Sequence, residues 1–174
     1  MVYYKRAETV RELEQILKIQ NENLPNALTK PEIENEGFVT VCHTLEQLIE
    51  MNTAFPHTIA VYKESVVGYA LSMPKEFGAE IEVLKPMFKK INEVYSDKSY
   101  IVMGQICITK AYRGKGLFRG LYSAMQDFTK PKFEAIITEV DTKNTRSINA
   151  HSAIGFKELT RYFADDHEWS LIVL

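Results

Sequence analysis

The sequence predicts a single α/β domain built around a sheet of mixed direction, and three observations predict it. The chain has 174 residues, which is about one domain on the usual prior of roughly 100–200 residues per domain. No linker-like or repetitive stretch divides it, so we expect one domain over residues 1–174. Strand-like and helix-like segments alternate, and two hairpin signals accompany them, which is typical of a mixed sheet flanked by helices.

The first half of the chain is expected to begin with a strand and two helices and to continue with a hairpin. Apolar residues fall at helical spacing up to residue 20, and Leu24-Pro25-Asn26 ends that helix. Thr44 and Gln47 have the spacing of a capping box, which starts the next helix. Two β-rich runs separated by three polar residues then indicate a hairpin. The expected elements are a strand at 2–6, helices at 10–20 and from 45, and strands at 58–62 and 66–73.

The second half is expected to alternate helices and strands and to end in a second hairpin. Pro86 suits the first turn of a helix, and Gly155 suits the position just after one. Residues 165–167, Asp-Asp-His, favour the turn between the last two strands. The expected elements are helices around 84–95, at 116–128 and at 145–153, and strands at 100–108, 133–140, 156–163 and 168–173.

Composition is that of an ordinary globular protein and excludes several classes. Hydrophobic residues make up 45% and charged residues 25%, and 21 basic against 23 acidic side chains give a net charge of −2. No strong field for nucleic acids is expected from that balance. No apolar run approaches the roughly 20 residues of a membrane span, and no signal-peptide pattern is present. We expect a cytoplasmic monomer or homodimer, without nucleic-acid or membrane partners, in which Cys42 and Cys107 are reduced.

The most informative segment is residues 106–119, where an expected strand runs through Arg-Gly-Lys-Gly at 113–116 into an amphipathic helix. The first turn of a helix has unpaired N–H groups at the positive end of the macrodipole. Glycines let the backbone approach a ligand closely, and Arg113 and Lys115 add positive charge. The segment predicts a site for a phosphate or pyrophosphate, with a solvated turn as the alternative. Neither the P-loop motif nor the dinucleotide fingerprint is complete, which disfavours a nucleoside triphosphate or a dinucleotide as the ligand.

Residues 112–118, Tyr-Arg-Gly-Lys-Gly-Leu-Phe, resemble motif A of the GNAT-type N-acetyltransferases, written Gln/Arg-x-x-Gly-x-Gly/Ala. Arg113 and Gly116 match the motif, and Phe118 stands where it has Gly or Ala. Residues 144–156 resemble motif B, in which an Asn and a short helix precede Gly-Phe. The order and separation of the two segments are also those of the family, and the resemblance covers roughly the last two thirds of the chain.

The resemblance implies a GNAT-like fold, with a mostly antiparallel sheet, a splayed central strand pair and flanking helices. It implies acetyl-CoA as cosubstrate and no metal. The coenzyme's pantetheine arm would enter between the strand that ends near Ile108 and the strand at 133–140, and its pyrophosphate would lie on the glycine loop. The implied cofactor-binding residues are Ile106, Cys107, Ile108, Arg113, Gly114, Lys115, Gly116, Leu117, Phe118, Arg119 and Asn144.

Two catalytic candidates follow from the resemblance and from the residues. His151 stands where many family members have a Tyr, and with Ser147 it resembles the Ser-x-x-x-His pattern of phosphinothricin-type acetyltransferases. It is the candidate acid, or a histidine that only packs or hydrogen-bonds on the helix. Glu139, with Asp141 beside it near the end of a strand, is the candidate base, or a solvated strand end. Gln105 can only orient a water or substrate, because an amide does not take up a proton.

Several residues admit two interpretations. Asn144 is expected to cap a helix, and the resemblance adds a hydrogen bond to the pantetheine arm. Cys107 is either a site of acetylation or, more simply, a small buried apolar residue. The backbone N–H of Ile108 is a candidate oxyanion donor. Residues 74–98 are expected to cover the acceptor site. The aromatic residues that either line that site or fill the core are Tyr69, Tyr95, Tyr100, Tyr162 and Phe163.

These observations favour an N-acetyltransferase that moves an acetyl group from acetyl-CoA to a primary amine by direct attack in a ternary complex. The alternatives are a non-catalytic module that binds CoA or an acyl-CoA, and a site for an unrelated phosphate. The acceptor, whether a polyamine, an amino acid, an antibiotic or a peptide N-terminus, leaves no signal in the sequence.

Overall fold

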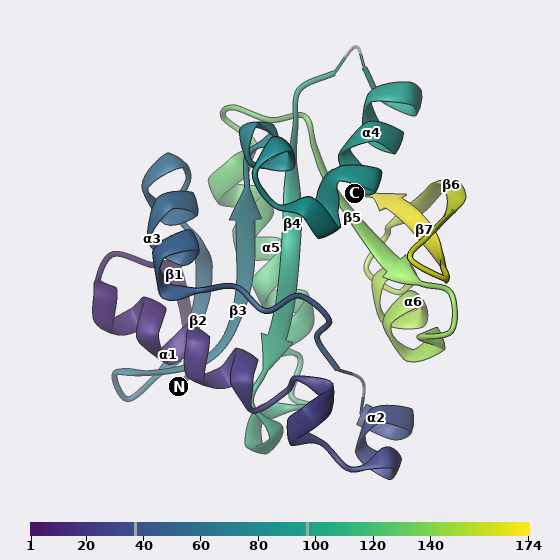
Figure 1. The fold of residues 1–174 in the computed structure, drawn as a ribbon. Coiled ribbons are helices and arrows are strands. Elements are labelled where there is room, and N and C mark those ends of the chain that lie inside the picture. The colour runs from purple at the N-terminus through teal and green to yellow at the C-terminus, as the bar shows by residue number, and fades with distance from the viewer. Residues whose placement is uncertain (37, 97) are drawn as a thin grey trace.

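The computed structural model of the chain describes residues 1–36, 38–96 and 98–174. They form a seven-stranded sheet in the order β1-β2-β3-β4-β5-β7-β6, with helices on both faces (Figure 1). The strands are β1 Tyr3–Arg6, β2 Thr58–Tyr62, β3 Ser65–Met73, β4 Tyr100–Ile108, β5 Ala135–Asp141, β6 Lys157–Ala164 and β7 His167–Val173. The helices are α1 Val10–Asn21, α2 Lys30–Glu36, α3 Leu45–Ala54, α4 Lys85–Val94, α5 Leu117–Thr129 and α6 Thr145–Ser152.

The sheet parts in the middle. All neighbouring strands are antiparallel except β4 and β5, which are parallel and pair only over Tyr100–Val102 and Ala135–Ile137. Beyond those residues the two strands diverge (Figure 1). At the point of parting the Thr138 hydroxyl donates to the Met103 carbonyl at 2.8 Å, so a side chain replaces the next backbone pair. This arrangement confirms the expected mostly antiparallel α/β sheet with a splayed central pair.

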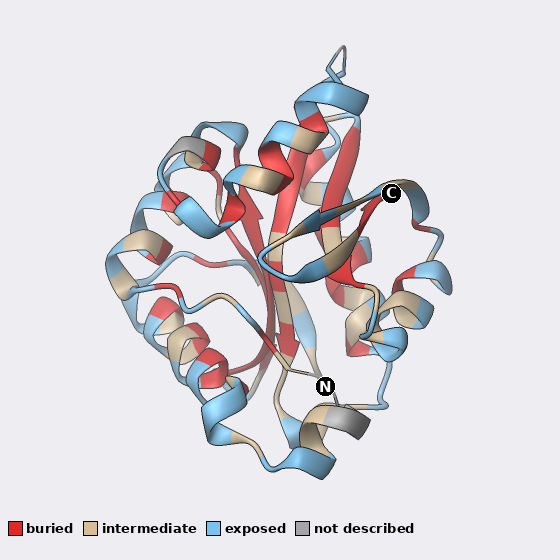
Figure 2. Ribbon diagram, turned by 45° about the vertical axis from the view of Figure 1, so that its right-hand side comes forward, coloured by how far each residue is buried: buried red, intermediate tan, exposed pale blue. Residues whose placement is uncertain are grey.

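The two faces of the sheet bury separate apolar clusters. On one face α1, α3 and α4 pack on side chains such as Tyr69 and Leu71. On the other face α5 and the end of α6 pack on side chains such as Ala70 and Ile101. Figure 2 shows the buried residues running along the central strands. The alternation of the two faces along β3 follows from the period of two in a strand. The sheet is thereby a rigid frame from which the strand ends project.

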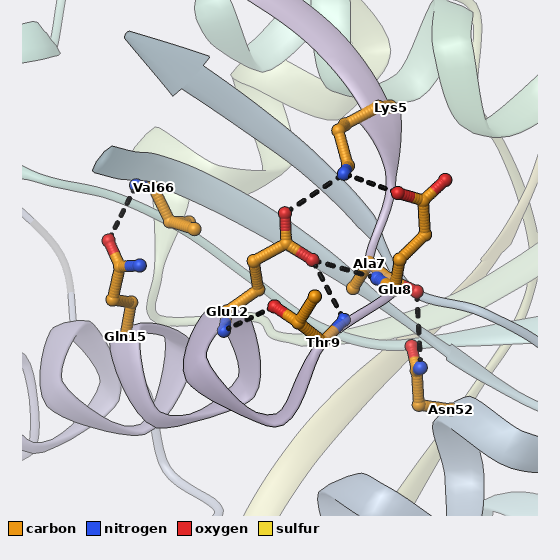
Figure 3. Close-up of polar contacts among 8 residues, drawn as sticks. All are labelled: Lys5, Ala7, Glu8, Thr9, Glu12, Gln15, Asn52 and Val66. Carbon is orange, nitrogen blue, oxygen red and sulfur yellow. Dashed lines mark hydrogen bonds and ion pairs between the residues drawn. The ribbon is translucent and has the colours of Figure 1, made fainter. Parts of the chain in front are cut away.

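Capping boxes fix the start of two helices. The predicted one is confirmed, because Thr44 Oγ1 accepts from Gln47 N at 3.2 Å and Gln47 Oε1 accepts from Thr44 N at 3.0 Å. A second one, which the sequence analysis did not identify, starts α1 with the same exchange between Thr9 and Glu12 (Figure 3). Each such cap contributes about 1 kcal/mol. Figure 3 also shows Gln15 of α1 accepting from the backbone N–H of Val66, which seats α1 on β3.

The structure differs from the expected elements mainly in one helix and two turns. Helix α2 was not expected, because Lys30–Glu36 carries no apolar stripe. Both hairpin turns have two residues rather than three, with positive φ at Lys63 and Glu64 and at Asp165 and Asp166. Such turns match the twist of antiparallel strands and usually contain Gly or Asn, which are absent here. Of the helices described, none combines the length and apolar character needed to span a bilayer.

Candidate active site

The glycine loop after β4 takes the shape that an anion site requires. Gly114 and Gly116 have φ values of +71° and +81°, and no heavy atom lies within 4 Å of a Cβ built on either. Gly116 is the N-cap of α5, and no side chain caps the helix there. The backbone at the start of α5 is therefore open to a ligand and carries the positive end of the helix dipole. A side chain in this left-handed conformation would cost roughly 1–2 kcal/mol.

A first cavity of about 360 Å³ lies against this loop, between the end of β4 and the start of α6. Lys115 and Arg119 do not line it. The Lys115 ammonium lies 5.0 Å from the centre of the Tyr112 ring, and Arg119 Nη2 donates to the Ala153 carbonyl at 3.0 Å. The expected residues that do line it are Ile106, Cys107, Ile108, Arg113, Gly114, Gly116, Leu117, Phe118 and Asn144. The lining residues that were not expected are Asn23, Phe38, Arg146, Ser147 and Ala150.

A second, smaller cavity of about 110 Å³ adjoins the first where β4 and β5 diverge. Glu139, Asp141, His151 and Trp169 line it, as does Gln105. The lining residues that it shares with the first cavity are Phe38, Ile106, Asn144 and Ser147. These four residues form a wall between the two cavities, which we call the partition.

Glu139 is the ionisable group of the second cavity best suited to take up a proton. Its half-buried carboxylate accepts a hydrogen bond from the Tyr162 hydroxyl of β6. Burial raises the pKa of Glu139 to about 7, the Tyr162 hydrogen bond opposes that rise, and the charge of Asp165 adds to it. Burial and the neighbouring carboxylate in turn raise the pKa of Tyr162. A carboxylate with a pKa near neutral is an effective general base at physiological pH.

Two other polar side chains of the second cavity have hydrogen-bond partners within the protein. Asp141 accepts from Lys143 N at 2.8 Å and lies 2.5 Å from His167 Nδ1, so its partner is a basic side chain, whereas the partner of Glu139 is the Tyr162 hydroxyl. Gln105 accepts from the Tyr69 hydroxyl at 2.5 Å and donates to the Val41 carbonyl at 2.7 Å. Both side chains are held in fixed positions in the wall of the cavity.

His151 lines the second cavity, yet both of its ring nitrogens bond within the protein. Nδ1 lies 2.7 Å from the Ser147 carbonyl, which can only accept, so Nδ1 carries the proton. Nε2 then accepts from the Tyr122 hydroxyl at 2.7 Å. The ring packs edge-on against Phe118 and Phe156 and is 2% exposed. Burial lowers the pKa of His151 to about 4, so the ring is neutral at physiological pH.

The structure is compatible with both interpretations of Asn144 and favours one of the two for Cys107. Asn144 caps α6, since its Oδ1 accepts from Ser147 N at 3.1 Å, and it also lines both cavities. Burial raises the pKa of the Cys107 thiol to about 11. A thiol that stays protonated is a poor nucleophile, which favours the role of a buried apolar residue.

The segment that covers the second cavity is residues 38–43, which we call the strap. It crosses the front of the sheet from α2 towards α3 (Figure 1), and Phe38, Thr40 and Val41 line the cavity. Residues 74–98, which the sequence analysis expected there, are not among the residues that line either cavity in the described part of the chain. Of the aromatic candidates, Tyr69 and Tyr100 belong to the core, whereas Phe163 is 79% exposed.

Comparison with known proteins agrees with this geometry. A sequence model of the acetyltransferase (GNAT) family matches residues 13–156. No curated protein matches the chain in sequence. The ribosomal-protein-S18-alanine N-acetyltransferase of Escherichia coli has a similar structure, with a TM-score of 0.65 and 15% identity over 100% of this chain and 93% of that one.

Two further solved structures have the same fold. The ribosomal-protein-alanine N-acetyltransferase of Brucella melitensis has a TM-score of 0.67 and 21% identity, over 99% of this chain and 98% of that one. The yncA structure of Salmonella typhimurium, solved with its cofactor acetyl-CoA, has a TM-score of 0.67 and 15% identity, over 100% and 93% of the two chains.

Proposed function

Because the chain belongs to the acetyltransferase (GNAT) family, we propose that it binds acetyl-CoA in the first cavity and transfers the acetyl group to a primary amine held in the second. The observation that carries the proposal is the partition: an open helix N-terminus serves one cavity, a carboxylate with a pKa near 7 serves the other, and the two cavities share a wall.

The residues of the first cavity fit the coenzyme. The backbone around Gly114 and Gly116 leaves space that any side chain would fill, and Arg113 and Arg146 give the lining positive charge. These groups suit a diphosphate. Beyond Val102 the edge of β4 no longer pairs with β5, and residues 106–108 line the first cavity, so the peptide groups that they do not use in the ladder with β3 are available on that side. They suit the amides of a pantetheine arm, and Lys115 and Arg119 would add charge at the rim.

The residues of the second cavity fit an amine. Alkyl amines are protonated at neutral pH, so the carboxylates of Glu139 and Asp141 attract them, and the Trp169 ring offers a further favourable contact for a cation. Acetyl-CoA supplies the acetyl group as a thioester. Glu139 takes one proton from the ammonium, directly or through a water, and frees the nitrogen lone pair. The bond between the nitrogen and the carbonyl carbon forms, the carbon–sulfur bond breaks, and the second proton lost by the nitrogen goes to the released thiolate.

We assign the base to Glu139 and do not assign the acid to His151, the role that the resemblance to the phosphinothricin-type pattern implies. The ring contacts of His151 support a role in packing and in fixing Tyr122. The backbone N–H of Ile108 remains the proposed oxyanion donor. A non-catalytic CoA-binding module is the second candidate, but it would have no use for a carboxylate of raised pKa in the adjoining cavity.

The test combines calorimetry with a thiol assay. We expect acetyl-CoA to bind in the micromolar range and free thiol to appear only when an amine from a panel of polyamines, amino acids, aminoglycosides and peptides is added. Binding without thiol release across the panel would favour the non-catalytic module. Absence of binding at high micromolar acetyl-CoA would refute the proposal, and competition by ATP but not CoA would indicate an unrelated phosphate ligand.

A further inference from the structure

Among the residues that the structure describes, backbone groups of the strap over the second cavity hydrogen-bond to the rest of the protein at three places. Gln20 of α1 holds His43 by both of its backbone groups, each at 3.0 Å. Gln105 of β4 donates to the Val41 carbonyl at 2.7 Å. The backbone N–H of Val39 donates to the carbonyl of Asn23 at 3.1 Å. Because Phe38 directly precedes Val39, the third of these bonds sets where the partition between the cavities stands.

Asn23 is a junction between the strap, helix α1 and the glycine loop. It is 5% exposed, and its Nδ2 donates to the Ile19 carbonyl at 2.7 Å. Its Oδ1 accepts from Arg113 Nη2 at 2.5 Å, while its backbone carbonyl accepts from the strap. One buried residue therefore connects the loop of the first cavity to the cover of the second.

Arg113 completes the connection at the end of β4. Its Nε donates to the Ile108 carbonyl at 3.1 Å while its Nη2 donates to Asn23. Only a planar guanidinium presents two donors in this fixed geometry, and a lysine ammonium is a single point of charge. The exposed ion pair of Lys110 with Glu32 of α2 lies near the same loop, but exposed pairs contribute little.

We propose that Arg113 and Asn23 are positioning residues for the acceptor: they hold the strap so that Phe38 separates the two cavities. The proposal rests on the proposed function, since it takes the second cavity as the acceptor site. Under this proposal Arg113 helps to position the strap over the acceptor cavity, in addition to its predicted contact with the diphosphate. Loss of the bridge would loosen the strap and open the second cavity while the glycine loop keeps its own backbone shape.

The single tryptophan of the chain provides a readout that needs no known acceptor. Trp169 lines the second cavity and not the first. We expect acrylamide to quench its fluorescence more strongly in Asn23→Ala and in Arg113→Lys than in the wild type. Asn21→Ala, at the exposed end of α1 two residues away, is the matched control and should quench like the wild type. Thermal unfolding identifies any variant that fails to fold.

Coenzyme and acceptor measurements complete the test. We expect the Kd of CoA to change by less than about threefold in Asn23→Ala, because that variant keeps the charge of Arg113. Arg113→Lys is judged by Trp169 quenching, since Arg113 is also a predicted contact of the diphosphate. With the best amine of the panel, we expect KM to rise about tenfold, the order of loss seen when a buried hydrogen bond is left unmade. Unchanged Trp169 quenching in folded Asn23→Ala would overturn the proposal. So would a large loss of CoA affinity in Arg113→Lys with quenching unaltered. Failure of the wild type to bind CoA would instead refute the proposed function.

Discussion

The two cavities are built by different means. The first is made largely of backbone: glycines at positive φ, the uncapped start of α5 and the free edge of β4. The second is made of side chains that come from five separate stretches of the chain and is closed by the strap. A site built of backbone has a local sequence signature, whereas a site built of distant side chains has none. We therefore expect substitutions in the first cavity to change the affinity for the coenzyme and substitutions in the second to change the rate of the chemical step.

The largest expected effect lies in the second cavity. Glu139→Gln removes the carboxylate that we propose takes up the proton, so we expect kcat to fall by about 10²–10⁴-fold, the usual contribution of a general base. The Kd of CoA should stay unchanged. In the wild type the rate should rise with pH as Glu139 ionises around its pKa of about 7, and this limb should vanish in the variant. Glu134→Gln, at an exposed site just before β5, is the control; wild-type turnover in Glu139→Gln would exclude Glu139 as the base.

The next effect lies in the first cavity. Gly116→Glu places a carboxylate and a strained backbone at the start of α5, and we expect the Kd of CoA to rise roughly a hundredfold through strain and charge together. Gly116→Ala brings the strain without the charge and should lose less affinity. Calorimetry measures both variants, and an affinity for CoA in Gly116→Glu equal to that of the wild type would show that no diphosphate lies against this loop.

His151 distinguishes packing from chemistry at the wall of the second cavity. His151→Phe leaves the buried Tyr122 hydroxyl without its acceptor, so we expect the free energy of unfolding to fall by about 1–3 kcal/mol. We expect kcat to change by less than roughly threefold, because both ring nitrogens are already hydrogen-bonded within the protein. Urea unfolding and steady-state assays are the measurements. A stable variant with a much lower kcat would restore His151 as the acid.

The last effect is the dependence of stability on pH. Burial lowers the pKa of His43 in the strap to about 4, that of His57 to about 3 and that of His151 to about 4. Below an unfolded-state pKa of 6.5 the unfolded chain binds more protons than the folded one. The free energy of unfolding should therefore fall as pH falls, by up to about 1.4 kcal/mol per pH unit for each histidine.

Glu139 opposes this trend, because its raised pKa makes the folded chain bind more protons than the unfolded one between 4.5 and about 7. Three histidines against one carboxylate leave a net loss of stability in acid. Urea unfolding at about pH 7 and about pH 5 measures the difference. A free energy of unfolding that rises on acidification would contradict the burial of these rings.

The sequence predicted the features that depend on neighbouring residues. The glycine loop, the cap at Asn144 and the carboxylate on the strand that borders the opening all follow from local pattern. Asn23 and Phe38 could not be found in this way, since they reach the site only through the fold and lie in a segment without periodicity. Helix α2 escaped prediction for the same reason. At the first hairpin turn the residue types of Lys63 and Glu64 gave no hint of their positive φ values, whereas the aspartates of the second turn tolerate that conformation.

Because β4 and β5 pair over only three residues each, the sheet consists of two parts, which we call leaves, joined along a short stretch. One leaf is β1 to β4 and the other is β5 with β7 and β6. A coenzyme arm lying along the open edge of β4 would connect the two leaves where the hydrogen-bond ladder between β4 and β5 is missing. Such a ligand would stabilise the folded state, and the free energy of unfolding should rise with the logarithm of the coenzyme concentration once that concentration exceeds Kd.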